Sequence, residues 1–390
     1  MMKQTVRVVF LLMALALLNG CVQTEQGPEP VDGTITLTFL TIGKGDAFLL
    51  TAPGGEHYLI DTGKKEDYPQ IARFLRIKGI DTLDGIFLSH GHLDHAGSLE
   101  PLLDAFTVKK IYISAIDTVS YHEVDPEALG KTYQVPVERI TRGDILSQGG
   151  MTIRCWIPDQ ICADNENDNS VILRITYGET AFLLMGDAEL DEEAALLGSD
   201  EVIQANVLKL GHHGENDATS QALLEKVKPQ YALITGNETE NPDSENPDVA
   251  ARVQAVGAKA IYSECDGLGI DFRSDGKQIL VETVADPELP PEVSLSLQEL
   301  DRKNQRIVIK NTGTVDADLS GCTLFSQRGS KIFRFPNQVI LAPGNLITVS
   351  CRGNWREGDL LWDEDSVWKK KNDAACLYDS HFTLLDELTD

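Results

Sequence analysis

The residues of this chain that are best suited to chemistry lie between Gly85 and Gly97. The segment reads GIFLSHGHLDHAG, in which a short apolar run is followed at once by His90, His92, Asp94 and His95. A buried strand that ends in so many polar side chains is costly to form unless a cation binds them. Imidazole and carboxylate ligands suit zinc, and they also suit manganese or iron. The spacing separates the first two histidines from Asp94 and His95, which favours two adjacent metal ions.

Three further segments repeat the arrangement of an apolar run followed by a polar side chain. They read YLIDTG at 58–63, LLMGD at 183–187 and VLKLGHHG at 207–214. Together with the HxHxDH pattern, this ordered set resembles the metallo-β-lactamase superfamily. Any one of these motifs would be weak evidence, but the whole set in this order is specific.

This resemblance implies a dinuclear zinc site. His90 and His92 would bind one metal, and Asp94, His95 and His212 would bind the other. Asp187 would bridge the two metals. Asp61 would orient a ligand histidine, and His213 would donate a proton or contact the substrate. Asp94, His213 and Asp61 are therefore the predicted catalytic residues. The sequence leaves open which of His212 and His213 is the ligand. It also leaves open what replaces the third histidine of the first site, because 165–169 offers only amides and Asp168.

Within the superfamily, the first part of the chain resembles the extracellular hydrolase domain of ComEC-type competence proteins. The segments that carry this likeness are FLTIGKGDAFLLTAPGG, FLSHGHLDHAGSL, NDNSVILRITYG and FLLMGDAE, in addition to the motifs above. Two positions depart from the pattern of those proteins. Glu215 follows HHG where they continue with serine, and Glu245-Asn246-Pro247 stands where they tend to carry Tyr-Gly-His-Pro.

Hydrophobic periodicity predicts strands and helices that alternate through the first part of the chain. The resulting expectation is an α/β fold, a four-layer αββα sandwich if the resemblance holds. After the proline-rich DPELPP, short β-rich runs predict a small all-β, immunoglobulin-like sandwich, which resembles a lamin-tail domain. We expect five parts: a lipoprotein signal peptide (1–21), a tether (22–33), a hydrolase domain (34–285), a linker (286–291) and a lamin-tail-like domain (292–390).

The N-terminus predicts export. Lys3 and Arg7 precede an apolar run at 8–18 that is too short for a permanent membrane span but fits a secretory signal. Leu-Asn-Gly-Cys at 18–21 resembles the lipobox of bacterial lipoproteins, in which the cysteine is lipidated. We therefore expect a protein anchored by Cys21 to the outer face of the bacterial membrane, with secretion of the free protein as the alternative.

The net charge of −27 limits the choice of substrate. Almost all of the acidic excess belongs to the first domain, so its surface would repel a long polyanion. The two metals would reverse the field locally, and small or locally bound anions remain suitable. The chain also has seven cysteines, which leaves six beyond Cys21 without a spacing that pairs them or forms a CxxC motif.

These observations predict an extracellular, metal-dependent hydrolase that acts on a phosphodiester, with nucleic acid as one candidate. Two alternatives stay open. The chain could be an envelope-binding protein that docks through its lamin-tail domain and has a weak or inactive hydrolase domain. It could also hydrolyse a thioester or a lactam, because the same metal pair activates water toward carbonyl groups.

The lipid anchor gives the first prediction. Full-length protein should fractionate with membranes and incorporate labelled fatty acid, and Cys21→Ser should abolish the labelling and leave the protein soluble or unprocessed. Membrane fractionation and fatty-acid labelling measure this outcome. Equal labelling of the wild type and of Cys21→Ser would show that Cys21 is not the lipidation site.

Overall fold

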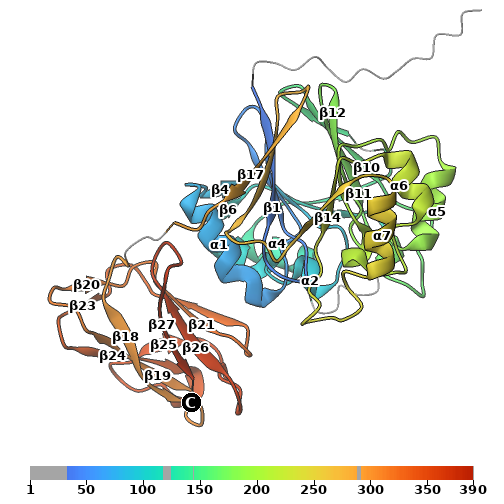
Figure 1. Cartoon of the computed structure of the whole chain (residues 1–390). Coiled ribbons are helices and arrows are strands. Elements are labelled where there is room, and N and C mark those ends of the chain that lie inside the picture. The colour runs from blue at the N-terminus through green and yellow to red at the C-terminus, as the bar shows by residue number, and fades with distance from the viewer. Residues whose placement is uncertain (1–32, 117–123, 144, 288–290, 390) are drawn as a thin grey trace, which may run out of the picture.

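The computed structural model describes residues 33–116, 124–143, 145–287 and 291–389. The predicted signal peptide and nearly all of the predicted tether lie outside these residues. Two large sheets face each other in the first part of the chain, and a separate pair of smaller sheets follows (Figure 1). None of the helices in the described ranges is long and apolar enough to cross a membrane.

The first sheet has eight strands in the order β17-β16-β1-β2-β3-β5-β7-β8. Its central strands β3 and β5 run parallel, so their carboxyl ends meet at the same edge. The strands of this sheet, in chain order, are β1 (Ile35–Leu40), β2 (Phe48–Thr51), β3 (His57–Ile60), β5 (Gly85–Phe87), β7 (Ile111–Ser114), β8 (Val137–Ile140), β16 (Gly269–Ser274) and β17 (Ile279–Val284).

The second sheet has seven strands in the order β15-β14-β13-β12-β11-β10-β9. Strands β12 and β13 are parallel neighbours, so their carboxyl ends lie at the same edge of this sheet. The strands of this sheet are β9 (Ile145–Gln148), β10 (Met151–Trp156), β11 (Ile172–Tyr177), β12 (Thr180–Leu184), β13 (Val207–Lys209), β14 (Tyr231–Ile234) and β15 (Lys259–Tyr262).

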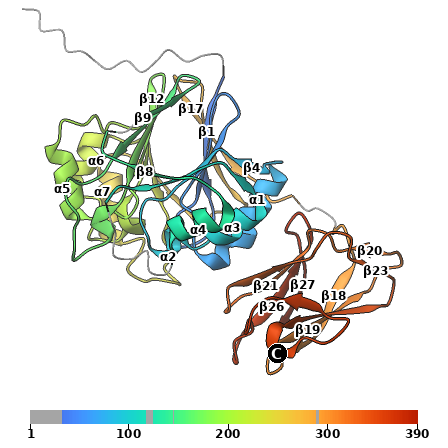
Figure 2. The ribbon, with the colours of Figure 1, turned by 180° about the vertical axis from the view of Figure 1, so that it is seen from behind.

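Helices cover the outer faces of the two sheets. Helices α1 (Tyr68–Ile77), α3 (Leu99–Ala105) and α4 (Pro126–Tyr133) lie on the first sheet, as Figure 2 shows from behind. Helices α5 (Leu190–Gly198), α6 (Gln221–Val227) and α7 (Pro247–Ala255) lie on the second sheet. One apolar cluster fills the space between the sheets, and one lies under each helical layer. The predicted αββα sandwich is therefore confirmed.

Short elements complete the first domain. They are α2 (Leu93–Ala96), the small pair β4 (Thr82–Leu83) and β6 (Thr107–Val108), and the 3-10 turns η1 (Lys65–Asp67), η2 (Asn167–Asn169) and η3 (Gly211–Gly214). The sequence analysis did not predict the β16–β17 hairpin. This hairpin pairs with β1 through β16 and extends the first sheet by two strands.

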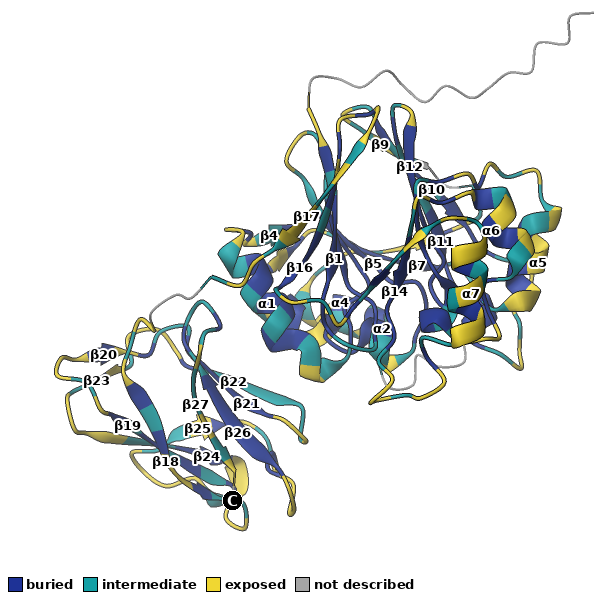
Figure 3. Cartoon of the chain, viewed as in Figure 1, coloured by how far each residue is buried: buried dark blue, intermediate teal, exposed yellow. Residues whose placement is uncertain are grey.

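The second domain is the expected β-sandwich. Its two four-stranded sheets, β18-β19-β24-β25 and β22-β21-β26-β27, enclose one apolar core that includes Trp362 and Trp368 (Figure 3). Trp355, by contrast, is 48% exposed. The elements are β18 (Leu295–Asp301), β19 (Arg306–Asn311), β20 (Ala317–Asp318), β21 (Thr323–Ser326), β22 (Lys331–Arg334), β23 (Ile340–Leu341), β24 (Leu346–Cys351), η4 (Arg352–Asn354), β25 (Leu360–Trp362), β26 (Ala374–Tyr378) and β27 (Leu384–Thr389). Within the described ranges no two cysteines are joined by a disulfide.

Helix α5 carries a buried carboxyl group that the sequence analysis did not predict. Glu192 is 2% exposed, and neither of its carboxyl oxygens makes a hydrogen bond of good geometry within the described residues, although the Ser170 backbone lies close by. Burial, reinforced by the charge of Asp168, raises the pKa of Glu192 well above its ordinary value. The folded protein therefore favours the protonated carboxyl group.

This burial predicts a pH-dependent stability. Because the folded pKa of Glu192 lies above the unfolded one, the group favours folding below about pH 4.5 and opposes it increasingly as pH rises through the folded pKa. Glu192→Gln should be more stable than the wild type at pH 8, by on the order of 1 kcal/mol for each pKa unit, and nearly equal to it at pH 4. Denaturant unfolding at both pH values measures this, with exposed Asp191→Asn on the same helix as the control. A destabilised Glu192→Gln at pH 8 would contradict the argument.

Candidate metal centre

Chain segments at one edge of the two sheets bring the polar side chains together. Asp61 follows β3, the histidine-rich segment follows β5, Asp187 follows β12, and η3 with its two histidines follows β13. The loop between β1 and β2 adds residues from a fifth segment. Because these strands are held by the cores on both of their faces, the positions of the residues that follow them are fixed by the sheets.

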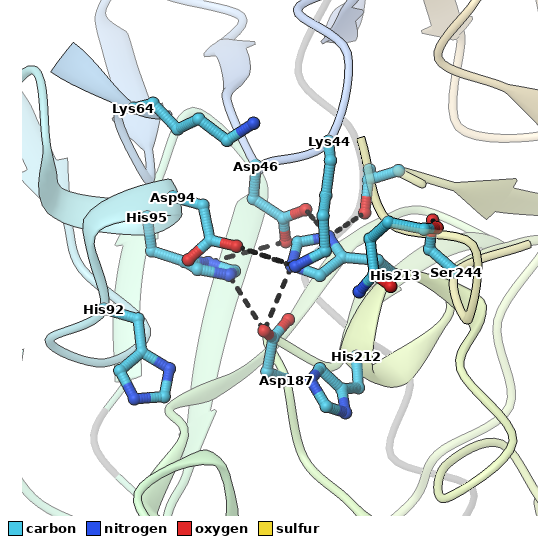
Figure 4. A network of polar contacts seen from close by, with 12 residues as sticks. Lys44, Asp46, Lys64, His92, Asp94, His95, Asp187, His212, His213 and Ser244 are labelled. Carbon is cyan, nitrogen blue, oxygen red and sulfur yellow. Dashed lines mark hydrogen bonds and ion pairs between the residues drawn. The ribbon is translucent and has the colours of Figure 1, made fainter. Parts of the chain in front are cut away.

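Two imidazoles converge on one oxygen of Asp187. The Nε2 atoms of His95 and His213 each lie 3.1 Å from Asp187 Oδ2. Asp94 Oδ2 is 3.3 Å from the same nitrogen of His213, and His90 Nε2 is 3.9 Å from Asp187 Oδ2 (Figure 4). His90, His95 and His213 have no exposed surface, and Asp187 is 2% exposed. The site is thus a buried cluster of nitrogen and carboxylate donors.

His92 stands at the more open side of this cluster. Its Nδ1 atom lies 3.0 Å from His90 Nε2, so the two histidines present their nitrogens to a common point. Burial, and then the neighbouring His95, lower the pKa of His90 well below its ordinary value. His90 is therefore neutral and has a lone pair available for a metal. The predicted pairing of His90 with His92 agrees with this geometry.

Asp61 holds His95 in place. Its Oδ2 atom accepts hydrogen bonds from His95 Nδ1 at 2.9 Å and from the Ser89 hydroxyl at 2.7 Å, while its Oδ1 atom accepts one from the Ser89 backbone N–H at 2.7 Å. With Nδ1 engaged, the ring directs Nε2 toward Asp187. Asp61 has φ 57°, a left-handed conformation that is rare for a residue with a side chain and that persists where the surroundings impose it.

The structure exchanges the places predicted for His212 and His213. His213, not His212, lies beside Asp94 and Asp187. His212 instead points its Nδ1 atom toward Asp217 at 3.0 Å and Glu189 at 3.5 Å, while its Nε2 atom lies 3.3 Å from the Asn167 amide nitrogen. Both histidines are left-handed, with φ 42° and 54°, and this turn sends the two rings in different directions. The structure therefore favours His213 over His212 as the residue that joins Asp94, a choice that the sequence left open.

Sequence analysis missed two charged residues at the centre, Asp46 and Lys209. Lys209 is fully buried at the end of β13, with Nζ 2.6 Å from Asp46 Oδ2 and 3.2 Å from Asp187 Oδ1. It also donates to the Gly186 carbonyl at 2.7 Å. The available signal was a lysine in the apolar run VLKL and an aspartate just before the apolar run AFLL. Buried charges of this kind need partners, and here they fix the carboxylate of Asp187.

The buried charges shift one another's protonation. Burial alone would raise the pKa of Asp187, but His213, His95 and Lys209 outweigh it and hold that pKa well below its usual range. Burial also acts to lower the pKa of His95 and of His213. The neighbouring Asp187 is the largest of the opposing effects, and the pKa of both histidines is raised above its ordinary value. The Asp187 carboxylate is thus ionised and attracts positive charge to this point.

The position expected for a third histidine is occupied by η2. Asp168 accepts hydrogen bonds at 3.1 Å from the backbone N–H groups of Glu189 and Glu192, so it caps the start of α5. Asn167 lies beside His212, and its amide oxygen has no hydrogen-bond partner among the described residues. Asn246, where the competence proteins tend to have histidine, caps α7 through Asp248 N–H.

The donor set fits divalent metal ions. Although each lies 3.1 Å from Asp187, the Nε2 atoms of His95 and His213 make no hydrogen bond of good geometry within the described residues, and Asp46 Oδ1 makes none either. Buried polar atoms without partners are unfavourable unless something else satisfies them. Among the described residues, Asp46, His95 and His213 form one group spaced to hold an ion, and His90, His95 and Asp187 form another.

A cleft of about 780 Å³ opens beside Asp94. Lys44 marks the border between the cleft and the metal centre, because its ammonium group donates to Asp94 Oδ2 at 3.0 Å. The lining side chains come from several elements and mix basic, acidic and apolar groups, among them Lys64, Lys65, Leu93, Glu100, Val124, Leu129, Glu240 and Ser330. A cleft of this size holds a small organic ligand.

Comparison with known proteins agrees with this geometry. The model of the metallo-beta-lactamase superfamily matches residues 40–235, which hold every residue of the metal centre. This chain belongs to the metallo-beta-lactamase superfamily. The lamin tail domain model matches residues 290–390, so the second domain is a lamin tail domain. The superfamily fold implies binding of divalent metal and the chemistry of a metal-dependent hydrolase.

Curated relatives of this chain include competence proteins. It is 24% identical over 273 residues to ComE operon protein 3 of Bacillus subtilis, covering 66% of this chain and 34% of that protein. It is 26% identical over 257 residues to Competence protein ComA of Neisseria gonorrhoeae, covering 65% of this chain and 34% of that protein. The chain thus spans about a third of the length of these relatives. The predicted likeness to ComEC-type proteins is confirmed.

Solved structures give more distant matches. A diphosphatase from the PhnP family is 17% identical, with a TM-score of 0.40, and the match covers 62% of this chain and 98% of that one. The metallo-beta-lactamase fold protein YhfI of Bacillus subtilis is 15% identical, with a TM-score of 0.41, and covers 61% and 99%.

The exchange of His212 and His213 gives a sharp prediction. His213→Ala should lower the metal content of the purified protein from about two ions per chain to about one, because it removes a buried donor at Asp94 and Asp187. His212→Ala should retain both ions. Metal analysis after gel filtration compares these two neighbouring, chemically identical changes. Loss of metal from His212→Ala alone would restore the original assignment.

Proposed function

We propose that this chain is a dinuclear zinc phosphodiesterase that works outside the cell. The observation that carries the proposal is the convergence of two buried imidazole nitrogens on one carboxylate oxygen of Asp187, where neither makes a hydrogen bond of good geometry within the described residues. His90 and His92 would hold one zinc ion, His95 and His213 with Asp94 the other, and Asp187 would be shared. Imidazole with carboxylate favours zinc, with manganese or iron as the other metals that this donor set suits.

Bound zinc would supply Lewis acidity and lower the pKa of water to near neutrality. The chain's own residues do the positioning. Asp61 fixes the ring of His95 through Nδ1, and Thr235 lies 2.9 Å from Nδ1 of His213. Lys209 and Asp46 hold Asp187 from the side opposite its histidine contacts. None of these donors needs to reorganise, which is the condition for stabilising developing charge efficiently.

His212 is the residue suited to move a proton. With Nδ1–H donating to Asp217, its Nε2 atom can accept a proton and then deliver it to a leaving oxygen. Glu189 stands on the same side of the ring at 3.5 Å and would stabilise the imidazolium form. His212 is partly exposed, which allows exchange with solvent. We therefore transfer the proton-donating role predicted for His213 to His212.

Two features support a phosphodiester over a carbonyl substrate. Lys44, Lys64 and Lys65 line the cleft beside the centre, each paired with a carboxylate, and a phosphoryl oxygen can take the place of that partner because ammonium groups suit it. The relatives are named competence proteins, which favours a substrate related to nucleic acid. Export, the lipid on Cys21 and a location on the outer face of the membrane remain part of this proposal, with residues 1–32 outside the described structure.

The function is tested with metal-loaded, full-length protein. Bis-nitrophenyl phosphate should be hydrolysed, and Asp187→Ala should lower kcat by at least about a thousandfold, because it removes a donor shared by both metals. Asp191→Asn serves as an acidic control outside the centre. A chromogenic lactam and a thioester are assayed in parallel. Turnover of either with no turnover of the phosphodiester would replace the proposed bond type, and protein that binds no metal would refute the proposal altogether.

A further inference from the structure

One face of strand β22 in the lamin tail domain is turned toward the hydrolase domain. Side chains alternate along a strand, so Ile332 and Arg334 share one face and Phe333 takes the other. Phe333 is buried in the core of the lamin tail domain. Ile332 packs against the apolar cluster of α1 and α3 in the hydrolase domain, and Arg334 bonds to residues of the same two helices. Ser330, two residues before Ile332, lines the cleft beside the metal centre.

Specific contacts hold the domains in this arrangement. Phe382 is 3% exposed and meets Tyr68 of α1 edge-on, with ring centroids 5.3 Å apart and planes at 90°. Arg334 donates to the Asp104 carbonyl at 2.8 Å and to the Tyr68 hydroxyl at 3.3 Å. An aromatic ring buried across an interface, with hydrogen bonds beside it, is the pattern of an interaction hot spot.

A second bridge restricts the linker. Arg73 of α1 binds both carboxylate oxygens of Asp286 through its Nε atom, at 3.0 and 3.2 Å. The same guanidinium group donates to the Thr383 hydroxyl at 2.9 Å and to the Pro287 carbonyl at 3.0 Å. One arginine thus joins the hydrolase domain, the start of the linker and the lamin tail domain. The planar, multivalent guanidinium group suits this role.

The cleft that Ser330 helps to close has two kinds of lining. Leu93, Val124 and Leu129 form an apolar part, and Leu93 is 46% exposed although it lies next to Asp94. Lys44 and Lys65 lie near this part and are paired with Asp94 and Glu100, so a phosphate group would displace these carboxylates to reach the ammonium groups. An apolar wall beside ammonium groups fits a substrate that joins a flat or aryl group to a phosphate, as a nucleotide does.

We propose that the lamin tail domain forms one wall of the substrate cleft and limits it to short phosphodiesters that bear a base or aryl group. This proposal rests on the phosphodiesterase function proposed above. The tip of the β21–β22 hairpin contributes Ser330 to the lining on one side of the cleft. A dinucleotide fits within about 780 Å³, whereas a long strand needs a cleft that is open at that side. The domain therefore determines specificity instead of acting only as a tether.

The proposal is tested by separating the domains within the full chain. The double variant Phe382→Ser/Arg334→Ala removes the buried ring and the hydrogen bonds of the interface. Arg352→Ala, which removes surface ion pairs with Asp363 and Asp365 elsewhere in the lamin tail domain, is the matched control. Cooperative unfolding and near-UV circular dichroism establish that the variants fold, and small-angle X-ray scattering measures separation of the domains.

The activity readout compares a dinucleotide with a single-stranded 20-mer. Separation should raise kcat/KM for the 20-mer about tenfold and change the dinucleotide value by less than about threefold. Ser330→Trp, which narrows the cleft and passes the same folding and scattering checks, should raise KM for the dinucleotide about tenfold with little change in kcat. Scattering that shows separated domains with an unchanged ratio of the two substrates would overturn the proposal, and so would a wild type whose domains are already apart.

A measurement independent of turnover distinguishes this failure from failure of the proposed function. Acetylation of Lys44, Lys64 and Lys65, mapped by mass spectrometry, should be several-fold faster in the double variant than in the wild type, with exposed Lys370 as the internal standard. A wild type that hydrolyses neither substrate would refute the phosphodiesterase function. Faster acetylation would still support the wall, and equal acetylation would overturn it.

Discussion

The metal centre depends on one energetically unfavourable feature, the burial of the Asp187 carboxylate among other ionisable groups. A lone carboxylate in such a place would not stay ionised, because burial penalises its charge. Lys209 on one side and two imidazoles on the other reverse that penalty. The sheets, the left-handed turns and the loop that carries Asp46 serve this arrangement, since each brings a partner that a buried charge requires. A divalent cation is the natural completion of a cluster whose carboxylates outnumber its lysines.

Local pattern was sufficient to predict the strand-end residues but not the direction of their side chains. Asp61, His90 and Asp187 each follow an apolar run, and an apolar run that ends in a donor is visible in the sequence. His212 and His213 are adjacent and chemically identical, so no pattern separates them. Two successive left-handed residues decide which ring turns inward, and that backbone choice depends on tertiary packing around η3. For the same reason the role of Lys209 could not be predicted, because its partner Asp46 lies 163 positions earlier in the chain.

The limits of the fold prediction have a similar origin. The segment that forms β16 and β17 alternates and contains Asp275-Gly276, so the signal for a hairpin was present and was overlooked. The contact between the domains had no such signal. Phe382 is a single aromatic residue in a polar segment, and it has φ 57°, which no strand or helix pattern predicts. Sequence periodicity reports how one element buries its own face, whereas a contact between two finished domains is set by their shapes.

Charge resolves the apparent conflict between an acidic protein and an anionic substrate. Electrostatic forces at long range and binding contacts at short range respond differently to salt. Salt screens the long-range forces over about 10 Å, whereas it leaves contacts in a buried site nearly unaffected. The acidic surface therefore acts on a long polyanion over its whole length but on a small diester only weakly. Lys44 stands where the cleft meets the centre, and a short anion that arrives there competes with Asp94 for its ammonium group. A surface that repels and a site that attracts together favour small substrates over polymers, and a wall at the end of the cleft acts in the same direction.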